Sequence, residues 1–147
     1  MEISVIKLGP GDSAKFGELL DVFAAVFEMN GFIQPPPDYL EKLLLQDGLT
    51  VLTAIYQGSV VGGLTAYTLA SVYSPSAEMY IYDLAIKTSF QRKGAGSLLL
   101  KELKDHCRRA GIKEIFVQAD RPDQHAIDFY TKNGGSAEDV LHFSFPV

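Results

Sequence analysis

The chemically most informative stretch of the sequence is a basic turn that carries two glycines. The turn reads Gln91-Arg92-Lys93-Gly94-Ala95-Gly96. The residues before it are aromatic or branched, as in a strand, and after it apolar residues recur at helical spacing. The glycines let a ligand approach the main chain, while the helix N-terminus and the two basic side chains supply positive charge. The arrangement predicts a phosphate-binding turn between a strand and a helix.

The glycine spacing narrows the class of phosphate ligand. The sequence has neither the Gly-x-x-x-x-Gly-Lys-Ser/Thr pattern of nucleoside triphosphate sites nor the Gly-x-Gly-x-x-Gly pattern of dinucleotide sites. Only Gly94 and Gly96 are present in the run. A solvated basic turn without a ligand is the competing interpretation.

Three further residues, an aspartate and two histidines, have side chains suited to proton transfer. Asp83 interrupts an otherwise apolar strand, where an unpaired charge is costly, so it should face a cleft or a partner. It is the candidate base or amine-orienting carboxylate, and an ion pair with an arginine is the alternative. His125 and His142 are alternative candidates for a base, but the sequence assigns neither of them a role.

Length and composition set limits on the class of protein. The 147 residues, of which 47% are hydrophobic, predict a single domain over residues 1–147. The net charge of −5 argues against binding to nucleic acid or to an anionic membrane, and it is compatible with a cationic substrate. Cys107, the only cysteine, rules out an internal disulfide and is expected to be buried. The first residues, Met1-Glu2-Ile3-Ser4-Val5, have neither a basic region nor a long apolar run, so we expect no secretory signal. The charge-free residues 48–77 are interrupted by glycines and fit two strands better than a membrane span, so we expect a cytoplasmic protein.

Hydrophobic periodicity predicts a mixed α/β (α+β) fold. The expected elements are a strand at 3–8, a helix at 12–29, a helix from 38, a hairpin at 49–70, a strand at 78–87, a helix ending at 110, a strand at 113–119, a helix from 123 to about 132, and a closing strand within 140–147. The strand–helix–strand unit around the basic turn requires its two strands to be parallel. The pattern therefore predicts a sheet with a hairpin and a parallel fourth and fifth strand, flanked by helices.

The basic turn also matches the Gln/Arg-x-x-Gly-x-Gly/Ala signature of the GNAT N-acetyltransferases, and the whole order of elements resembles that superfamily. Separate segments resemble the type I aminoglycoside 3-N-acetyltransferases more closely. These segments are Tyr80-Ile81-Tyr82-Asp83-Leu84-Ala85-Ile86, Val117-Gln118-Ala119-Asp120, Phe129-Tyr130-Thr131-Lys132, His142-Phe143, Pro37-Asp38-Tyr39-Leu40 and Val60-Val61-Gly62. The resemblance implies the GNAT fold, a mixed and mostly antiparallel sheet whose parallel fourth and fifth strands splay apart, flanked by helices. It also implies acetyl-CoA as co-substrate and no metal.

The resemblance also implies a set of residues that hold the coenzyme. The backbone of the fourth strand would pair with the pantetheine arm, and the N–H groups of the turn would hold the pyrophosphate. The implied residues are Leu84, Ala85, Ile86, Gln91, Arg92, Lys93, Gly94, Ala95, Gly96, Ser97, Asp123 and Ala126. Tyr130 would be the general acid, because a phenol is a proton donor, and an aromatic residue packed on the core is the alternative.

The implied acceptor is the 3-amino group of an aminoglycoside, a ligand with several ammonium groups. The residues expected to bind it are Glu28, Asp38, Tyr82, Asp83 and Asp120. Two departures from the family pattern stand out: Asp123 replaces a common Asn, and Gly135 replaces a common Phe after the helix-ending glycine. A homodimer is expected only because the resemblance to this family implies one.

Two other functions agree with the same residues. One is a GNAT enzyme for another amine, such as a polyamine, a small amine or a protein N-terminus, because the turn does not contact the acceptor. The other is a catalytically silent coenzyme A sensor, against which Tyr130 and Asp83 argue, since a sensor needs neither.

Overall fold

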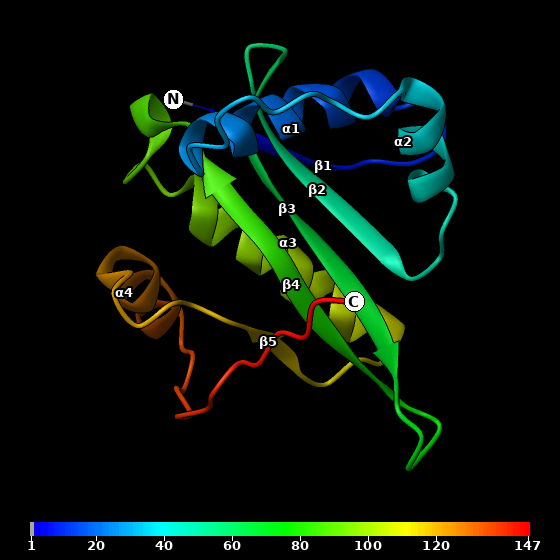
Figure 1. Cartoon of the computed structure of the whole chain (residues 1–147), viewed down its shortest axis with the longest axis vertical. Helices are drawn as coiled ribbons and strands as arrows, with labels where there is room; N and C mark the ends of the chain where they lie inside the picture. Colours follow the sequence, from blue (N-terminus) through cyan, green and yellow to red (C-terminus); the bar gives the residue numbers. More distant parts are fainter. Residues whose placement is uncertain (1) are drawn as a thin grey trace.

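The computed structural model describes residues 2–147, and its centre is a five-stranded sheet with the order β1-β2-β3-β4-β5 (Figure 1). The strands are β1 (Ser4–Lys7), β2 (Leu49–Tyr56), β3 (Ser59–Ala70), β4 (Ala77–Ile86) and β5 (Ile115–Val117). Neighbouring strands are antiparallel, except that β4 and β5 are parallel. The predicted fold class and the parallel pair are therefore confirmed.

Helices cover both faces of the sheet. They are α1 (Ser13–Val26), α2 (Pro37–Leu44), the short 3-10 helix η1 (Thr88–Phe90), α3 (Ala95–Ala110) and α4 (Gln124–Lys132). One core lies under α1 and α2 and includes Phe16, Leu19 and Leu40, whereas the other lies under α3 and includes Leu99 and Leu103. Burying both faces explains why the central strands are apolar along most of their length.

Local interactions fix the ends of these elements. The β2–β3 hairpin closes through Gln57 and Gly58, whose φ angles of 48° and 80° fit the tight turn that matches strand twist. Glu41 of α2 accepts hydrogen bonds from the backbone N–H groups of Gly11 and Ser13, so α2 stabilises the start of α1. Gly111 ends α3 at a φ of 75°, as the sequence predicts.

A bulge in β4 changes which face of the sheet its side chains reach. The β4 side chains that pack into the core under α3 are those of Met79, Ile81, Leu84 and Ile86. The alternation of side chains therefore shifts by one residue between Ile81 and Leu84. The pairing with β3 shows the cause, because Thr65 faces Asp83 and the next residue faces Ile81, which leaves Tyr82 without a partner. Since a bulge holds two residues opposite one, Tyr82 and Asp83 both turn to the face that carries α1.

Beyond the bulge, β4 also loses its partner on the other edge. The parallel pairing with β5 runs only from Met79–Ile115 to Ile81–Val117. From Tyr82 to Ile86, β4 pairs with β3 alone. The predicted splay of the two parallel strands is present, and it leaves one backbone edge of β4 without a strand partner.

Two expectations about the end of the chain need correction. The fifth strand is shorter than predicted and covers only Ile115–Val117, and the predicted closing strand within 140–147 is wrong. Residues 136–147 form no backbone hydrogen bond within the described part of the chain, so their alternating apolar pattern has no partner to make it a strand. Cys107 is buried as expected. No helix among residues 2–147 has the length and apolar character needed to cross a membrane.

Candidate active site

The basic turn forms a row of backbone donors at the start of α3. Arg92 and Gly94 have positive φ angles of 60° and 87°, on either side of Lys93. Within the described chain no backbone N–H group from Arg92 to Ser97 has a backbone partner, and the first helical bond is that of Leu98 to the Gly94 carbonyl, 3.0 Å. Such a concave run of free N–H groups at a helix N-terminus binds anions.

The structure favours glycine at the two positions of the turn for different reasons. Gly94 lies in the left-handed region, and a Cβ atom there would meet nothing within 4 Å, so its backbone conformation requires glycine and the space beside it is open. A Cβ atom on Gly96 would lie 2.9 Å from the ring of Phe129. In this structure Gly96 therefore lets α4 pack against the start of α3, whereas only Gly94 borders open space.

Gln91 attaches the turn to the end of β4. Its side-chain amide donates a hydrogen bond of 3.0 Å to the carbonyl of Ile86. That carbonyl belongs to the stretch Leu84–Ile86, which pairs with β3 on one side and has no strand on the other. The open edge of β4 and the anion-binding turn are thus held together at one place in the fold.

Asp83 is fixed by a residue of the neighbouring strand. Its carboxylate is half-buried, and its Oδ2 accepts a hydrogen bond of 2.7 Å from the hydroxyl of the buried Thr65. Burial raises the pKa of Tyr67, and the negative charge of Asp83 raises it further, followed by smaller effects of Tyr82 and Tyr39. The predicted base therefore lies in a cluster with hydroxyl and phenol groups from β3, β4 and α2.

Aromatic side chains form a row across three strands beside Asp83. The ring centroids of Tyr67 and Tyr82 are 5.9 Å apart, as are those of Tyr82 and Tyr80. Tyr80 then stacks on Phe116 of β5 at 4.7 Å. The side chain of Tyr82, predicted to bind substrate, is 65% exposed, so this row presents aromatic surface to a ligand.

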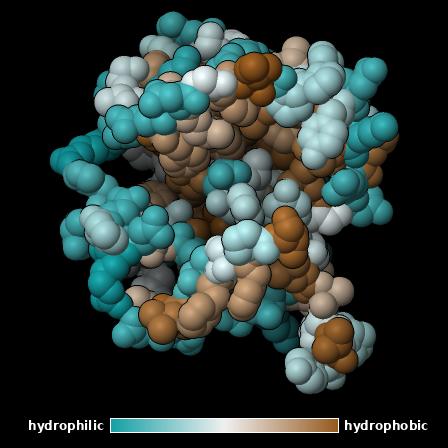
Figure 2. All heavy atoms as spheres, viewed as in Figure 1, coloured by the Kyte–Doolittle hydropathy of each residue, from teal (hydrophilic) through white to brown (hydrophobic). Residues whose placement is uncertain are grey.

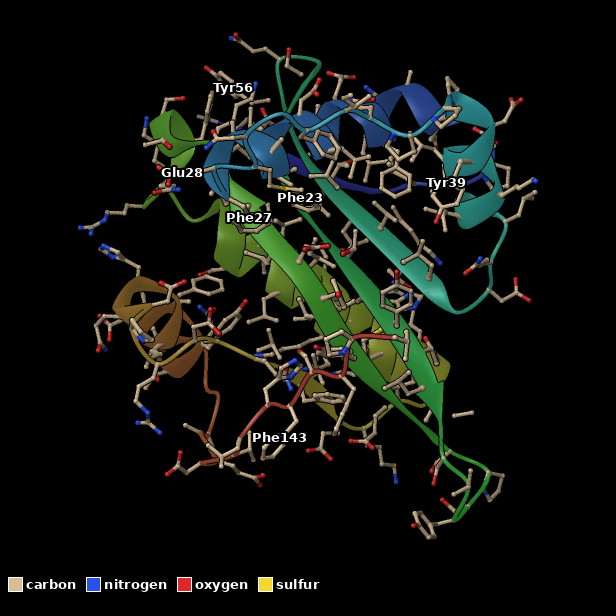
Figure 3. All side chains as sticks on the ribbon, viewed as in Figure 1. Phe23, Phe27, Glu28, Tyr39, Tyr56 and Phe143 are labelled. Carbon is tan, nitrogen blue, oxygen red and sulfur yellow. The ribbon has the colours of Figure 1, made fainter. Side chains whose placement is uncertain are left out.

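A recess separates this region from α4. Figure 2 shows it in the middle of the view, with brown walls, between the part formed by α1 and the part formed by α4. In Figure 3 Phe27 and Glu28 lie at the end of α1, close to the tip of β4. The recess is therefore bordered by the strand end from which the anion-binding turn departs.

Tyr130 approaches the same strands from α4. It lines a hollow of about 340 Å³ together with Ile81 and Val117, the last residue pair before β4 and β5 separate. Burial, and to a smaller extent the charge of Asp123, raises the pKa of Tyr130 to about 12. The phenol stays protonated at neutral pH, as a proton donor must.

Two residues predicted to hold the coenzyme, Asp123 and Ala126, form the N-terminal cap of α4. The side chain of Asp123 accepts a hydrogen bond of 3.1 Å from the backbone N–H of Ala126. An aspartate in the cap position stabilises a helix start, and it keeps this N–H group occupied.

Of the other predicted substrate residues, Glu28 has the most unusual backbone. It follows α1 with a φ of 52°, and the Met29 N–H donates to the Ala24 carbonyl at 2.9 Å. This is the helix-ending position at which glycine is usual, and a non-glycine residue there costs about 1 kcal/mol. Asp38 lies in the first turn of α2, where it stabilises the helix, and Asp120 is exposed before α4.

Sequence reasoning missed the contribution of β3 and the role of Gln91. Thr65 and Tyr67 alternate with apolar residues, which indicates a shared face of the strand. Their contact with Asp83 depends on the bulge at Tyr82, and no feature of the sequence marks it.

The sheet topology and the row of backbone donors at the start of α3 correspond to a known protein family. The Acetyltransferase (GNAT) family model matches residues 17–135, and the chain belongs to this family. The matched residues include the parallel, splayed strand pair and the row of backbone donors at the start of α3.

Solved structures give more specific similarities. The aminoglycoside acetyltransferase meta-AAC0020, from an uncultured soil metagenomic sample, has a TM-score of 0.96 and 39% identity, with 99% of this chain and 96% of that chain covered; its structure contains trehalose. The same protein has been solved with sisomicin. The aminoglycoside acetyltransferase HMB0005, also from an uncultured soil sample, has a TM-score of 0.94 and 38% identity, with 100% and 99% of the chains covered.

A curated relative is more distant. N-alpha-acetyltransferase 60 of Xenopus tropicalis is 27% identical in an alignment 115 residues long that covers 67% of this chain. This chain spans about half the length of that relative, at 48%.

The raised pKa of Tyr130 generates a prediction for alkaline pH. A phenol in the unfolded chain ionises near pH 10, below the folded value of about 12, so ionisation favours the unfolded state. The free energy of unfolding should fall as the pH rises from about 10 to about 12, and Tyr130→Phe should weaken this fall. Difference absorbance titration of tyrosinate and urea unfolding at each pH measure both effects. Tyr73→Phe, at a fully exposed tyrosine, is the control, and an equal change in both variants would contradict the assignment.

Proposed function

We propose that this protein is an acetyl-CoA-dependent N-acetyltransferase that acts on the 3-amino group of aminoglycoside antibiotics. The observation that carries the proposal is the Asp83 carboxylate, held beside exposed tyrosines next to the unpaired edge of β4. The 38–39% identity to aminoglycoside acetyltransferases, over nearly whole chains, supports the class of acceptor. The resemblance of Tyr80–Ile86 to type I 3-N-acetyltransferases supports the position of the amine.

The residues present fit acetyl-CoA. The free N–H groups from Arg92 to Ser97 would hold the pyrophosphate, with the open space at Gly94 allowing close approach. The unpaired backbone edge of Leu84–Ile86 would hold the pantetheine arm. When bound, the coenzyme supplies an acetyl thioester.

Proton transfer is the task of two side chains. Oδ2 of Asp83 accepts a hydrogen bond from Thr65, whereas Oδ1 has no hydrogen-bond partner among residues 2–147. Oδ1 would therefore take the proton from an ammonium group, directly or through a water. The Tyr130 hydroxyl, protonated at neutral pH because of its raised pKa, would donate a proton to a departing thiolate. The two groups come from opposite sides, Asp83 from β4 and Tyr130 from α4.

Charge and aromatic surface favour a polycationic acceptor. The chain has a net charge of −5, and Glu28, Asp38 and Asp120 add exposed carboxylates. An ammonium group placed over the face of a tyrosine gains about 0.5–2 kcal/mol. The row formed by Tyr67, Tyr82 and Tyr80 offers such faces next to Asp83.

A competition assay tests this function. Purified protein with acetyl-CoA should release thiol and acetylate gentamicin and kanamycin in preference to spermidine and to a peptide with a free N-terminus. Mass spectrometry and NMR should show one acetyl group on the 3-amine of the deoxystreptamine ring. Acetylation of spermidine or the peptide alone, or of another aminoglycoside amine, would contradict the proposed acceptor and leave the family membership intact. Coenzyme binding without transfer to any amine would instead identify a sensor.

We also propose that two copies form a dimer through the C-terminal segment. Leu141, Phe143 and Phe145 are 71–85% exposed in a stretch without backbone hydrogen bonds. β5 is an edge strand of only three residues beside the hollow lined by Ile81 and Val117. Each copy thus carries both an unpaired apolar segment and an unpaired sheet edge, and a two-fold exchange would satisfy both at once.

The dimer can be tested by sedimentation and by light scattering during gel filtration. The wild-type protein should have the mass of a dimer, and the double variant Phe143→Asp, Phe145→Asp that of a monomer. The control is Val72→Ser, Tyr73→Ser at the tip between β3 and β4, where the side chains are equally exposed. A monomeric wild type, or a variant that stays dimeric, would refute the proposed interface.

A further inference from the structure

We propose that Thr65 is a positioning residue that sets the orientation of the Asp83 carboxylate toward the acceptor amine. Thr65 lies on β3, directly opposite Asp83 in the strand register, and its side chain is 7% exposed. Its hydroxyl donates to Oδ2 of Asp83 at 2.7 Å, and this is the only hydrogen bond that its side chain makes within residues 2–147. The inference rests on the proposed function, because it gives Thr65 a role through Asp83.

The bulge at Tyr82 explains why the bond is needed. An aspartate that follows a bulge sits where the strand has lost its regular ladder, so the backbone alone defines the side-chain direction less well. Thr65 belongs to the last regular pair before the irregularity, on the well-paired strand β3. A hydroxyl from that strand can therefore anchor a carboxylate on the distorted one.

The hydrogen bond from Thr65 gives the two carboxylate oxygens of Asp83 different roles. Oδ2 accepts from Thr65, which leaves Oδ1 as the oxygen for the amine or its water. A β-branched threonine in a strand has few rotamers, so the hydroxyl itself is held in place. Catalysis by a general base depends on such placement, because the acceptor must lie within hydrogen-bond distance of the proton it takes.

The chain offers a matched control for this threonine. Thr53 on β2 is completely buried, and its hydroxyl donates to the carbonyl of Ile6 at 3.2 Å. Thr53→Val removes a buried hydroxyl of the same chemistry that has no contact with Asp83. A loss of turnover shared by both variants would reflect general damage to the sheet.

The test is a double-mutant cycle in steady-state acetylation of gentamicin. Thr65→Val keeps the shape of the side chain and should lower kcat about 10-fold, the lower range for losing a hydrogen bond to a charged group. Thr65→Ser restores the hydroxyl and should recover kcat to within about 2-fold, while KM for acetyl-CoA stays unchanged throughout. Asp83→Asn alone should lower kcat about 100-fold, and adding Thr65→Val should cause no further loss. Far-UV dichroism and thermal unfolding verify that each variant is folded.

The outcomes separate the two claims. If Asp83→Asn is slow but Thr65→Val is as fast as wild type or Thr53→Val, the positioning role is refuted and the proposed function stands. A Thr65→Val loss of equal size in the Asp83→Asn background would also refute it, since Thr65 would then act independently of Asp83. If Asp83→Asn has no effect, the base assigned under the proposed function is wrong, and the role of Thr65 fails with it.

Discussion

The structure depends most on the separation of β4 from β5 after the pair Ile81–Val117. A backbone edge inside a sheet is normally paired, and an unpaired polar group away from water costs free energy. Here the edge from Tyr82 to Ile86 is left open, and only the Ile86 carbonyl is satisfied, by Gln91. The rest of the fold compensates, because β3 pairs with every residue of β4 except the bulged Tyr82, and α1 and α3 cover its two faces. The open edge can therefore serve a ligand without loss of the fold.

Three structural features lie around the open edge of β4. The bulge turns Tyr82 and Asp83 to the face of α1, the turn from Arg92 to Ser97 presents free N–H groups, and α4 brings Tyr130 from the other side. Two of them use a departure from regular structure, namely a slipped alternation and two left-handed residues, and the third is a half-buried phenol. Irregular positions of this kind cost free energy and are concentrated at functional sites.

The sequence predicts those parts that local patterns determine. Periodicity and the glycines identify the strand, turn and helix around Gly94, because each is defined by neighbours in the chain. The bulge at Tyr82 escapes prediction, since aromatic and apolar residues occur on both sides of β4 and no alternation marks the slip. The hydrogen bond from Thr65 to Asp83 depends on that register, so the sequence does not predict it either. The tail around Phe143 alternates as a strand would, but a strand requires a partner, and periodicity does not supply one.

We propose that the main chain at the start of α3, rather than a set of side chains, holds the phosphates of the coenzyme. Amide NMR of the 15N-labelled protein tests it most directly. On addition of coenzyme A, the amide resonances from Arg92 to Ser97 should shift most and exchange with solvent more slowly, with Gly94 and Gly96 easily recognised by their nitrogen shifts. Unchanged resonances there, together with changes confined to residues around the hollow such as Cys107 and Ile112, would contradict the account.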